Sequence, residues 1–202
     1  GDPAKRYRED PIRMLRAVRF AAKTGFTLDA ATRAPIAKLG KLIHDVPSAR
    51  LFDEILKLLM SGYSWAAIQG LKDAGLHHGL LPLLDHILDK SADSKEANDF
   101  VRIALANTDQ RIQSGKSVSA GFLFATLLWP DLLSNWKKNI AKGISNIPAL
   151  HDAMDETIAS QSSGMVIQRR FESDMREIWS MQPRFEKRVG RYPYRLIESP
   201  RF

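Results

Sequence analysis

The spacing of apolar residues constrains the fold of this chain more than any other feature. Apolar side chains recur every three or four residues through most of the 202 residues. No segment alternates apolar and polar residues over the length of a half-buried strand. A period of three to four residues is typical of helices, so the sequence predicts an all-α fold.

Prolines, glycines and polar runs divide this helical pattern into segments. The first helix is expected at about 11–24, with Asp10 as its N-cap, Pro11 in its first turn and Gly25 after its last. Ser64 is expected to cap a later helix that Gly75 closes. The remaining helices are expected at about 32–42, 48–61, 79–88, 95–113, 118–128, 131–142, 148–160 and 165–181.

Polar breaks at 90–95, 113–119 and 158–165 are too short to be obvious linkers, but the first allows a domain boundary. We therefore expect a division into residues 1–90 and 91–202. The chain starts at Gly1 without an initiator methionine and stops at Phe202 without a polar tail, so both ends are expected to be cuts within a longer protein.

The formal net charge of +7 and the isoelectric point near 9.7 predict an anionic partner, with nucleic acid ahead of a membrane surface. No run of about 18 apolar residues is present, so no membrane span is expected. The absence of cysteine excludes disulfides and fits a reducing, cytoplasmic location.

The first helix has two contrasting faces. Leu15, Val18 and Ala22 share about one third of its circumference, with Met14 and Ala21 at the flank, and are expected to be core. The opposite face holds Arg13, Arg16, Arg19 and Lys23, with Phe20 among them. These cations repel one another, so an anion is expected nearby. It is either a set of acids on neighbouring helices or a bound phosphate or base.

Glu9, Asp10 and Arg13 have the chemistry to read a base. A carboxylate only accepts hydrogen bonds and a guanidinium only donates them. Side by side, they match an amino donor next to a ring-nitrogen acceptor, which adenine and cytosine offer. Guanine and uracil present the reverse pattern and would leave both protein groups unpaired.

The sequence EDPIR at 9–13 fits the EDxxR motif of class II nucleotidyltransferases, which are the bacterial poly(A) polymerases and CCA-adding enzymes. Its extension RMLRAVRFAAKTGF resembles the base-selecting neck helix of that family. ARLFDEILKLLMSG at 49–62 is similar to the helix beside the neck, and blocks at 107–112 and 121–129 extend the resemblance to about 130 residues. These later blocks favour the proteobacterial poly(A) polymerases. The resemblance implies neck and body regions, with residues 1–90 as the neck and 91–202 as the body.

The resemblance also implies roles for individual residues. The nucleotide-binding residues would be Asp10, Arg13, Glu9, Arg16 and Arg19. From their charge, we expect Lys23, Arg169, Arg170 and Arg188 to bind RNA. Arg50, Glu54 and Lys57 lie on one stripe of their helix and can form intrahelical pairs, so we expect them to brace Arg13 or the neck without touching substrate.

Nucleotidyl transfer uses two divalent metal ions held by carboxylates. In the family these come from a head domain with a Gly-Ser or Gly-Gly turn and a DxD strand, and neither is present here. We expect no catalytic residue and no metal in this chain, Mg²⁺ in the missing head, and no polymerase activity from the chain alone. His44-Asp45 and His151-Asp152 match the paired ligands of HD phosphohydrolases, but the sequence does not specify the further ligands.

The C-terminal part is basic and aromatic. Its cations can track an RNA backbone while its aromatic rings stack on bases. The helical spacing of Phe171, Ile178 and Trp179 favours a core role for those three instead. The other cations and aromatic residues of this C-terminal part are Arg176, Arg184, Lys187, Arg191, Arg195, Phe185, Tyr192 and Tyr194.

The function implied by the resemblance is template-independent addition of adenylate from ATP to RNA 3′ ends by the intact, monomeric protein. CCA addition to tRNA stays open, because the base-reading argument accepts both adenine and cytosine. A non-catalytic helical RNA-binding or adaptor module is the alternative of a different class.

Overall fold

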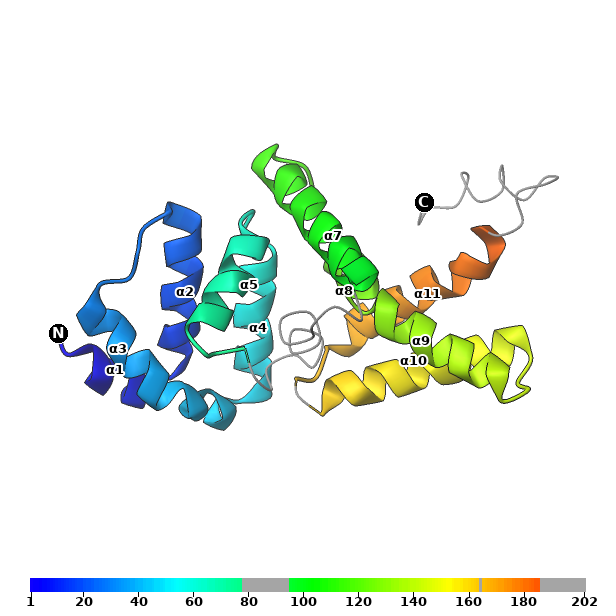
Figure 1. Cartoon of the computed structure of the whole chain (residues 1–202), viewed down its shortest axis with the longest axis horizontal. Helices are drawn as coiled ribbons and strands as arrows, with labels where there is room; N and C mark the ends of the chain where they lie inside the picture. Colours follow the sequence, from blue (N-terminus) through cyan, green and yellow to red (C-terminus); the bar gives the residue numbers. More distant parts are fainter. Residues whose placement is uncertain (78–94, 164, 186–202) are drawn as a thin grey trace. The chain divides into compact units, whose positions relative to one another are not determined.

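The computed structural model describes residues 1–77, 95–163 and 165–185. Every regular element in these ranges is a helix, which confirms the all-α prediction (Figure 1). Contacts divide the described residues into two compact units, one from 1–120 and 159–167, the other from 121–158 and 168 onward. The boundary expected near residue 90 and the helix expected at 79–88 lie outside the described residues. The described residues contain no helix that could span a membrane.

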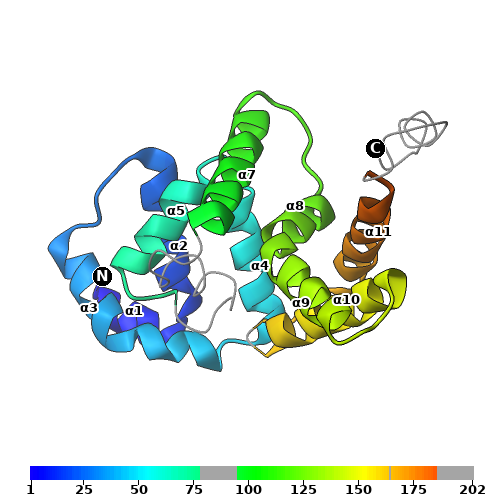
Figure 2. The ribbon, with the colours of Figure 1, turned by 45° about the vertical axis from the view of Figure 1, so that its right-hand side comes forward.

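The first unit is built from the helix at residues 12–24 and the helices around it (Figures 1 and 2). They are α1 (Pro3–Glu9), α2 (Ile12–Thr24), α3 (Ala30–Leu39), the 3₁₀ helix η1 (Gly40–Asp45), α4 (Ser48–Leu59), α5 (Ser64–Asp73) and α7 (Lys95–Gln113). Helix α2 has the predicted extent, and Gly25 follows it in the left-handed conformation with φ 70°. The helix expected at 32–42 is two elements instead, which meet at Gly40, and glycine is a poor helix former.

Helix α1 was not predicted, and it changes the role of Asp10. The Asp2 side chain caps α1 by accepting from the Ala4 N–H at 2.9 Å, with Pro3 in the first turn. Asp10 is the C-cap of α1, and its side chain makes no capping bond to α2, so its prediction as the N-cap is wrong. Because Asp10 ends one helix just before the next begins, its carboxylate is free to act across helices.

Contacts between α1 and α3 hold this start of the chain in place. The hydroxyl of buried Tyr7 donates to the Thr32 carbonyl at 3.3 Å. Burial, with a smaller effect from the charge of Asp29, raises the pKa of Tyr7. Asp29 caps α3 by accepting from the Thr32 N–H at 3.0 Å and from its hydroxyl at 2.6 Å, and these bonds lower the pKa of Asp29. This packing fixes the position of the C-terminal end of α1, where Asp10 lies.

The core of the first unit lies where α2 packs on α4 and α5. Leu15 and Val18 are buried as expected, and Met14 is completely buried although its position suggested a flank. Ala22 is only half-buried. A Cβ at Gly70 of α5 would lie 2.9 Å from the Val18 Cγ1 atom, so glycine permits this close approach of α2 and α5.

The N-terminus of α5 is capped from another helix. Asp109 of α7 accepts hydrogen bonds from the Ser64 N–H at 2.9 Å and the Ser64 hydroxyl at 3.0 Å. The expected capping by Ser64 is therefore wrong, because Ser64 lies inside α5 and donates its hydroxyl to the carboxylate. A buried negative charge at a helix N-terminus is favourable, and it joins α7 to α5.

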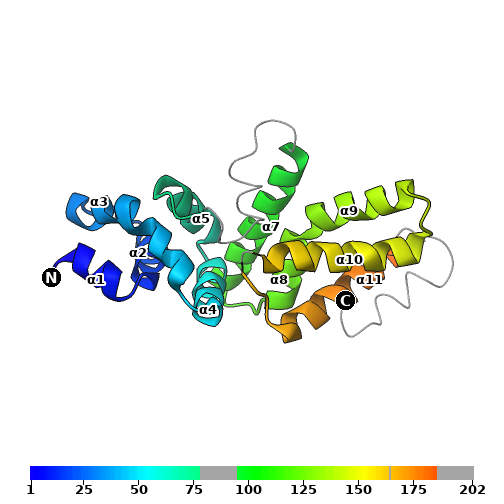
Figure 3. The same ribbon diagram turned by 90° about the horizontal axis from the view of Figure 1, so that it is seen from below.

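The second unit is formed by α8 (Ala120–Leu127), α9 (Trp129–Ala141), most of α10 (Asn146–Ser162) and α11 (Arg169–Phe185). Helices α9 and α10 run side by side (Figure 3), joined by a hydrogen bond of 3.1 Å from Asn135 to Thr157. Trp179 is buried and donates its indole N–H to the Ala125 carbonyl at 2.9 Å, so it belongs to the core.

Replacing Asp109 with alanine removes the cap of α5 and leaves the Ser64 N–H and hydroxyl buried without their acceptor. We predict that Asp109→Ala lowers the free energy of unfolding by about 1–3 kcal/mol, measured by urea titration. Gln110→Ala is the control, because Gln110 is an exposed neighbour on the same helix. Equal losses in the two variants would contradict the capping role.

Candidate functional site

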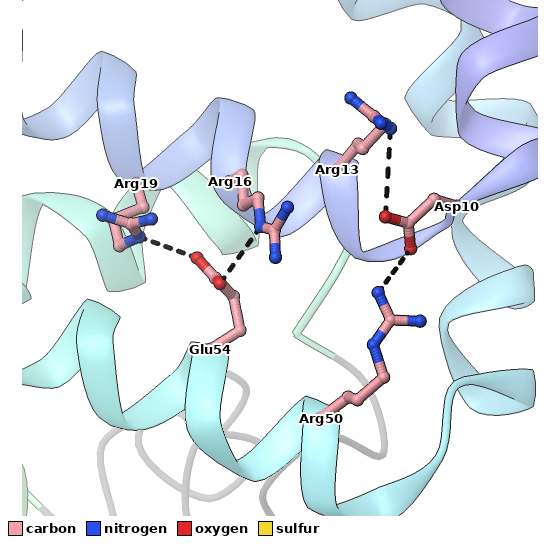
Figure 4. Close-up of polar contacts among 6 residues, drawn as sticks. All are labelled: Asp10, Arg13, Arg16, Arg19, Arg50 and Glu54. Carbon is pink, nitrogen blue, oxygen red and sulfur yellow. Dashed lines mark hydrogen bonds and ion pairs between the residues drawn. The ribbon is translucent and has the colours of Figure 1, made fainter.

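Asp10, at the end of α1, belongs to a polar cluster with side chains of α2 and α4 (Figure 4). Its side chain is 20% exposed, and its Oδ1 atom accepts from Arg50 Nη2 at 3.1 Å. Its Oδ2 atom faces Arg13 Nε at 3.9 Å. The carboxylate is therefore held between two arginines, one on α2 and one on α4.

Arg13 is incompletely satisfied in this arrangement. Its Nε atom is buried and has no hydrogen-bond partner within the described parts of the chain, while the side chain as a whole is 42% exposed. A shift of about 1 Å would bring the Nε atom into hydrogen-bond range of Asp10. Figure 4 shows the end of the guanidinium pointing away from Asp10. Arg13 thus presents donors beside a fixed carboxylate.

Glu54 of α4 is the anion that compensates the basic face of α2. Its side chain is 2% exposed, and it accepts from Arg19 Nε at 2.8 Å and from Arg16 Nε at 3.2 Å (Figure 4). The sequence allowed either an acid on a neighbouring helix or a bound phosphate or base as the anion near this face. For Arg16 and Arg19, the structure supplies an acid on a neighbouring helix, Glu54. Charge-assisted bonds of this kind are stronger than neutral ones.

Two of the three residues on the α4 stripe face α2 and Asp10. Arg50 and Glu54 are four residues apart and make their ion pairs with the Asp10–Arg19 segment, whereas Lys57 is exposed. Sequence spacing placed the three residues on one stripe, but it carried no signal for these cross-helix partners. The bracing role of Arg50, Glu54 and Lys57 stays a prediction.

The cluster keeps a surplus of positive charge. Four arginines (Arg13, Arg16, Arg19 and Arg50) share two carboxylates (Asp10 and Glu54), which leaves a net charge of +2. Lys23 adds an exposed cation in the last turn of α2. The surplus attracts anions after the internal pairs have formed.

The other candidate residues are exposed where the structure describes them. Glu9 is exposed at the end of α1. Arg169 and Arg170 are exposed at the start of α11 in the second unit, and the Arg170 guanidinium lies 4.5 Å from the Phe171 ring centroid. Arg188 lies outside the described residues.

The histidine–aspartate pairs do not form a metal centre in the described structure. His44 and Asp45 are exposed at the end of η1, and His151 and Asp152 are exposed on α10. Within residues 1–77, 95–163 and 165–185, no three histidine, aspartate or glutamate side chains are grouped so as to hold a metal ion.

Two family models match the chain. The model described as "Probable RNA and SrmB-binding site of polymerase A" matches residues 25–88. The model described as "Polymerase A arginine-rich C-terminus" matches residues 142–202. The Asp10–Arg19 segment precedes both matched regions.

Two poly(A) polymerases among the curated relatives match the whole chain. Poly(A) polymerase I of Escherichia coli O6:H1 is 37% identical over 203 residues, which is 100% of this chain and 43% of the relative. Poly(A) polymerase I of Haemophilus influenzae is 37% identical over 205 residues, 100% of this chain and 45% of the relative. The CCA-adding enzyme of Anoxybacillus flavithermus is 32% identical over 137 residues, 68% of this chain and 32% of that enzyme. The chain thus spans less than half the length of these relatives.

Neutralising Glu54 leaves two guanidinium groups without their shared anion. We predict that Glu54→Gln lowers the free energy of unfolding by about 2–4 kcal/mol, because breaking a buried ion pair strands the remaining charges. Urea titration followed by circular dichroism measures this loss. The matched control is Asp53→Asn, which removes the same charge from an exposed position on the same helix and is expected to change little. A near-neutral Glu54→Gln variant would show that the pairs contribute nothing to stability.

Proposed function

We propose, because this chain belongs to the bacterial poly(A) polymerase family, that the intact protein adds adenylate from ATP to RNA 3′ ends without a template. In this proposal the chain supplies base selection and RNA binding. The observation that carries it is the pairing of the Asp10 carboxylate with the Arg13 guanidinium in a partly exposed, positively charged cluster. The identity of 37% to poly(A) polymerase I over the whole chain supports the same reaction.

Base selection follows from hydrogen-bond polarity. Adenine would donate its 6-amino group to Asp10 and accept at N1 from a terminal nitrogen of Arg13. Each carboxylate oxygen has two lone pairs, so Asp10 can keep its bond to Arg50 while it accepts from the base. Guanine would place a carbonyl against the carboxylate and an N–H against the guanidinium. Asp10 and Arg13 would then both lack a hydrogen-bond partner on the base.

The remaining cations divide between support and phosphate contact. Arg19 has a side chain only 16% exposed and is held by Glu54, so we assign it mainly to supporting the site. Arg16 is 40% exposed and can contact a phosphate while its Nε atom stays on Glu54. We assign exposed Lys23 to contact with an RNA phosphate. Glu9, which precedes Asp10, is proposed to lie close to the nucleotide. Arg169, Arg170 and Arg188 are proposed as further RNA contacts.

The metal ions of the reaction are proposed to bind in a head domain, within the part of the relatives' length that this chain does not span. ATP is the substrate, and Mg²⁺ would activate the RNA 3′-hydroxyl and stabilise the leaving pyrophosphate. We therefore expect this chain alone to have no polymerase activity. We also propose that the intact protein acts as a cytoplasmic monomer.

CCA addition to tRNA is the second candidate function. It is supported by the 32% identity to a CCA-adding enzyme over 137 residues and by a hydrogen-bond pattern that cytosine also satisfies.

The family description of residues 25–88 supports RNA binding and adds a protein, SrmB, as a proposed partner of this region.

Changing Arg13 tests the base-reading role in the intact protein. We predict that Arg13→Lys, which keeps the charge but loses the planar fork, lowers kcat/KM for ATP by about 10- to 100-fold and narrows the preference over GTP and UTP. Steady-state incorporation of each nucleotide into an RNA primer measures this. Arg8→Lys is the control, because Arg8 is exposed on α1.

An unchanged nucleotide preference in Arg13→Lys would remove the base-reading role. Separate reactions of the unaltered protein with ATP and CTP, on tRNA lacking its terminal residues, distinguish the two candidate functions. Efficient incorporation of C would favour CCA addition.

A further inference from the structure

Phe20 is an exposed aromatic ring in the middle of a basic surface. It lies on α2, and 52% of its surface is accessible to solvent. The guanidinium carbon of Arg19 lies over the ring at 4.5 Å from its centroid. A cation at this distance is attracted to the electron-rich face of the ring. One face of Phe20 is therefore occupied by a partner within its own helix.

The partner of Phe20 is itself fixed. Arg19 donates from Nε to buried Glu54 at 2.8 Å, so the guanidinium that lies over the ring is anchored to α4. A ring held in this way loses little conformational entropy when a ligand contacts its open face. Glu54, Arg19 and Phe20 thus form a connected series from the core to the surface.

The neighbours of Phe20 are cations. At about 100° per residue, Arg13, Arg16, Phe20 and Lys23 fall within about 80° of the circumference of α2. The stripe is about 15 Å long at a rise of about 1.5 Å per residue. Arg13 and Arg16 are about 40% exposed, and Lys23 is exposed. No acidic residue interrupts the helix between Arg13 and Lys23.

An exposed ring among cations fits single-stranded nucleic acid better than it fits an apolar protein surface. Cations follow the phosphates of the strand, and an aromatic ring stacks on a base without regard to its identity. An apolar protein partner would have to desolvate Arg16 and Lys23 without compensating charge. We propose that Phe20 is a base-stacking contact for single-stranded RNA.

The position of Phe20 indicates which base it contacts. This step rests on the proposed function, in which the incoming nucleotide lies at Asp10 and Arg13. Phe20 follows Arg13 by seven residues, so it is about 10 Å further along nearly the same line of the helix. At about 3.4 Å per stacked base, that distance corresponds to about three bases. Phe20 therefore stacks on RNA near its 3′ end and does not contact the incoming ATP.

Equilibrium binding of oligoadenylate to the intact protein, without ATP, tests this contact. We expect Phe20→Leu to weaken binding about fivefold or more, because leucine is apolar but has no π face, and Phe20→Trp to retain it. Phe26→Leu is the control, because Phe26 is 77% exposed and lies outside the stripe. Urea titration is expected to give equal stability for Phe20→Leu and the unaltered protein.

A second series places one abasic residue at successive positions of the oligoadenylate. At one position within about three nucleotides of the 3′ end, we expect the abasic residue to weaken binding to the unaltered protein but not to Phe20→Leu. The abasic residue and the Phe20→Leu substitution remove the same stacking contact, so their effects on affinity do not add. Equal penalties in both proteins at every position, or full binding by Phe20→Leu, would overturn the proposal. A large loss of stability in Phe20→Leu would also overturn it, since Phe20 would then be packed against protein. None of these readouts needs adenylate transfer, so failure of the proposed function is scored separately by nucleotide incorporation.

Discussion

The buried carboxylate of Glu54 is the interaction on which the rest of the site depends. It is 2% exposed and is shared by Arg16 and Arg19, so it joins α4 to the basic face of α2. Without it, the arginines of α2 would repel one another and would have to turn toward solvent. With it, the Arg19 guanidinium is fixed over the ring of Phe20, and Arg16 is held against α4. The same helix also supplies Arg50 to Asp10.

Local signals in the sequence predicted local structure well. The extent of α2 and its end at Gly25 followed from spacing and from a glycine that adopts φ 70°. The apolar stripe located Leu15 and Val18 in the core. The stripe placed Met14 only at the flank of the core, whereas Met14 is completely buried. Helix α2 packs against both α4 and α5, so its buried face is wider than one stripe.

Long-range pairs could not be predicted in the same way. The chemistry of Asp10 and Arg13 was visible in the sequence, but Arg50 lies 40 positions from Asp10, and Glu54 lies 38 from Arg16. No periodicity specifies such partners. Asp10 and Ser64 both looked like N-caps, since both residue types favour that position. The structure uses Asp10 as an acceptor for Arg50, and it caps α5 with Asp109. Tertiary charge pairing decided both outcomes.

In the proposed function, Arg13 donates a hydrogen bond to the ring nitrogen N1 of the incoming adenine. The most direct measurement is kcat/KM of the intact protein for ATP and for 1-deaza-ATP, in which a C–H replaces that nitrogen while the 6-amino group remains. We predict that kcat/KM is at least about tenfold lower for the analogue, because Arg13 would face a C–H group that cannot accept a hydrogen bond. Equal use of ATP and 1-deaza-ATP would contradict it.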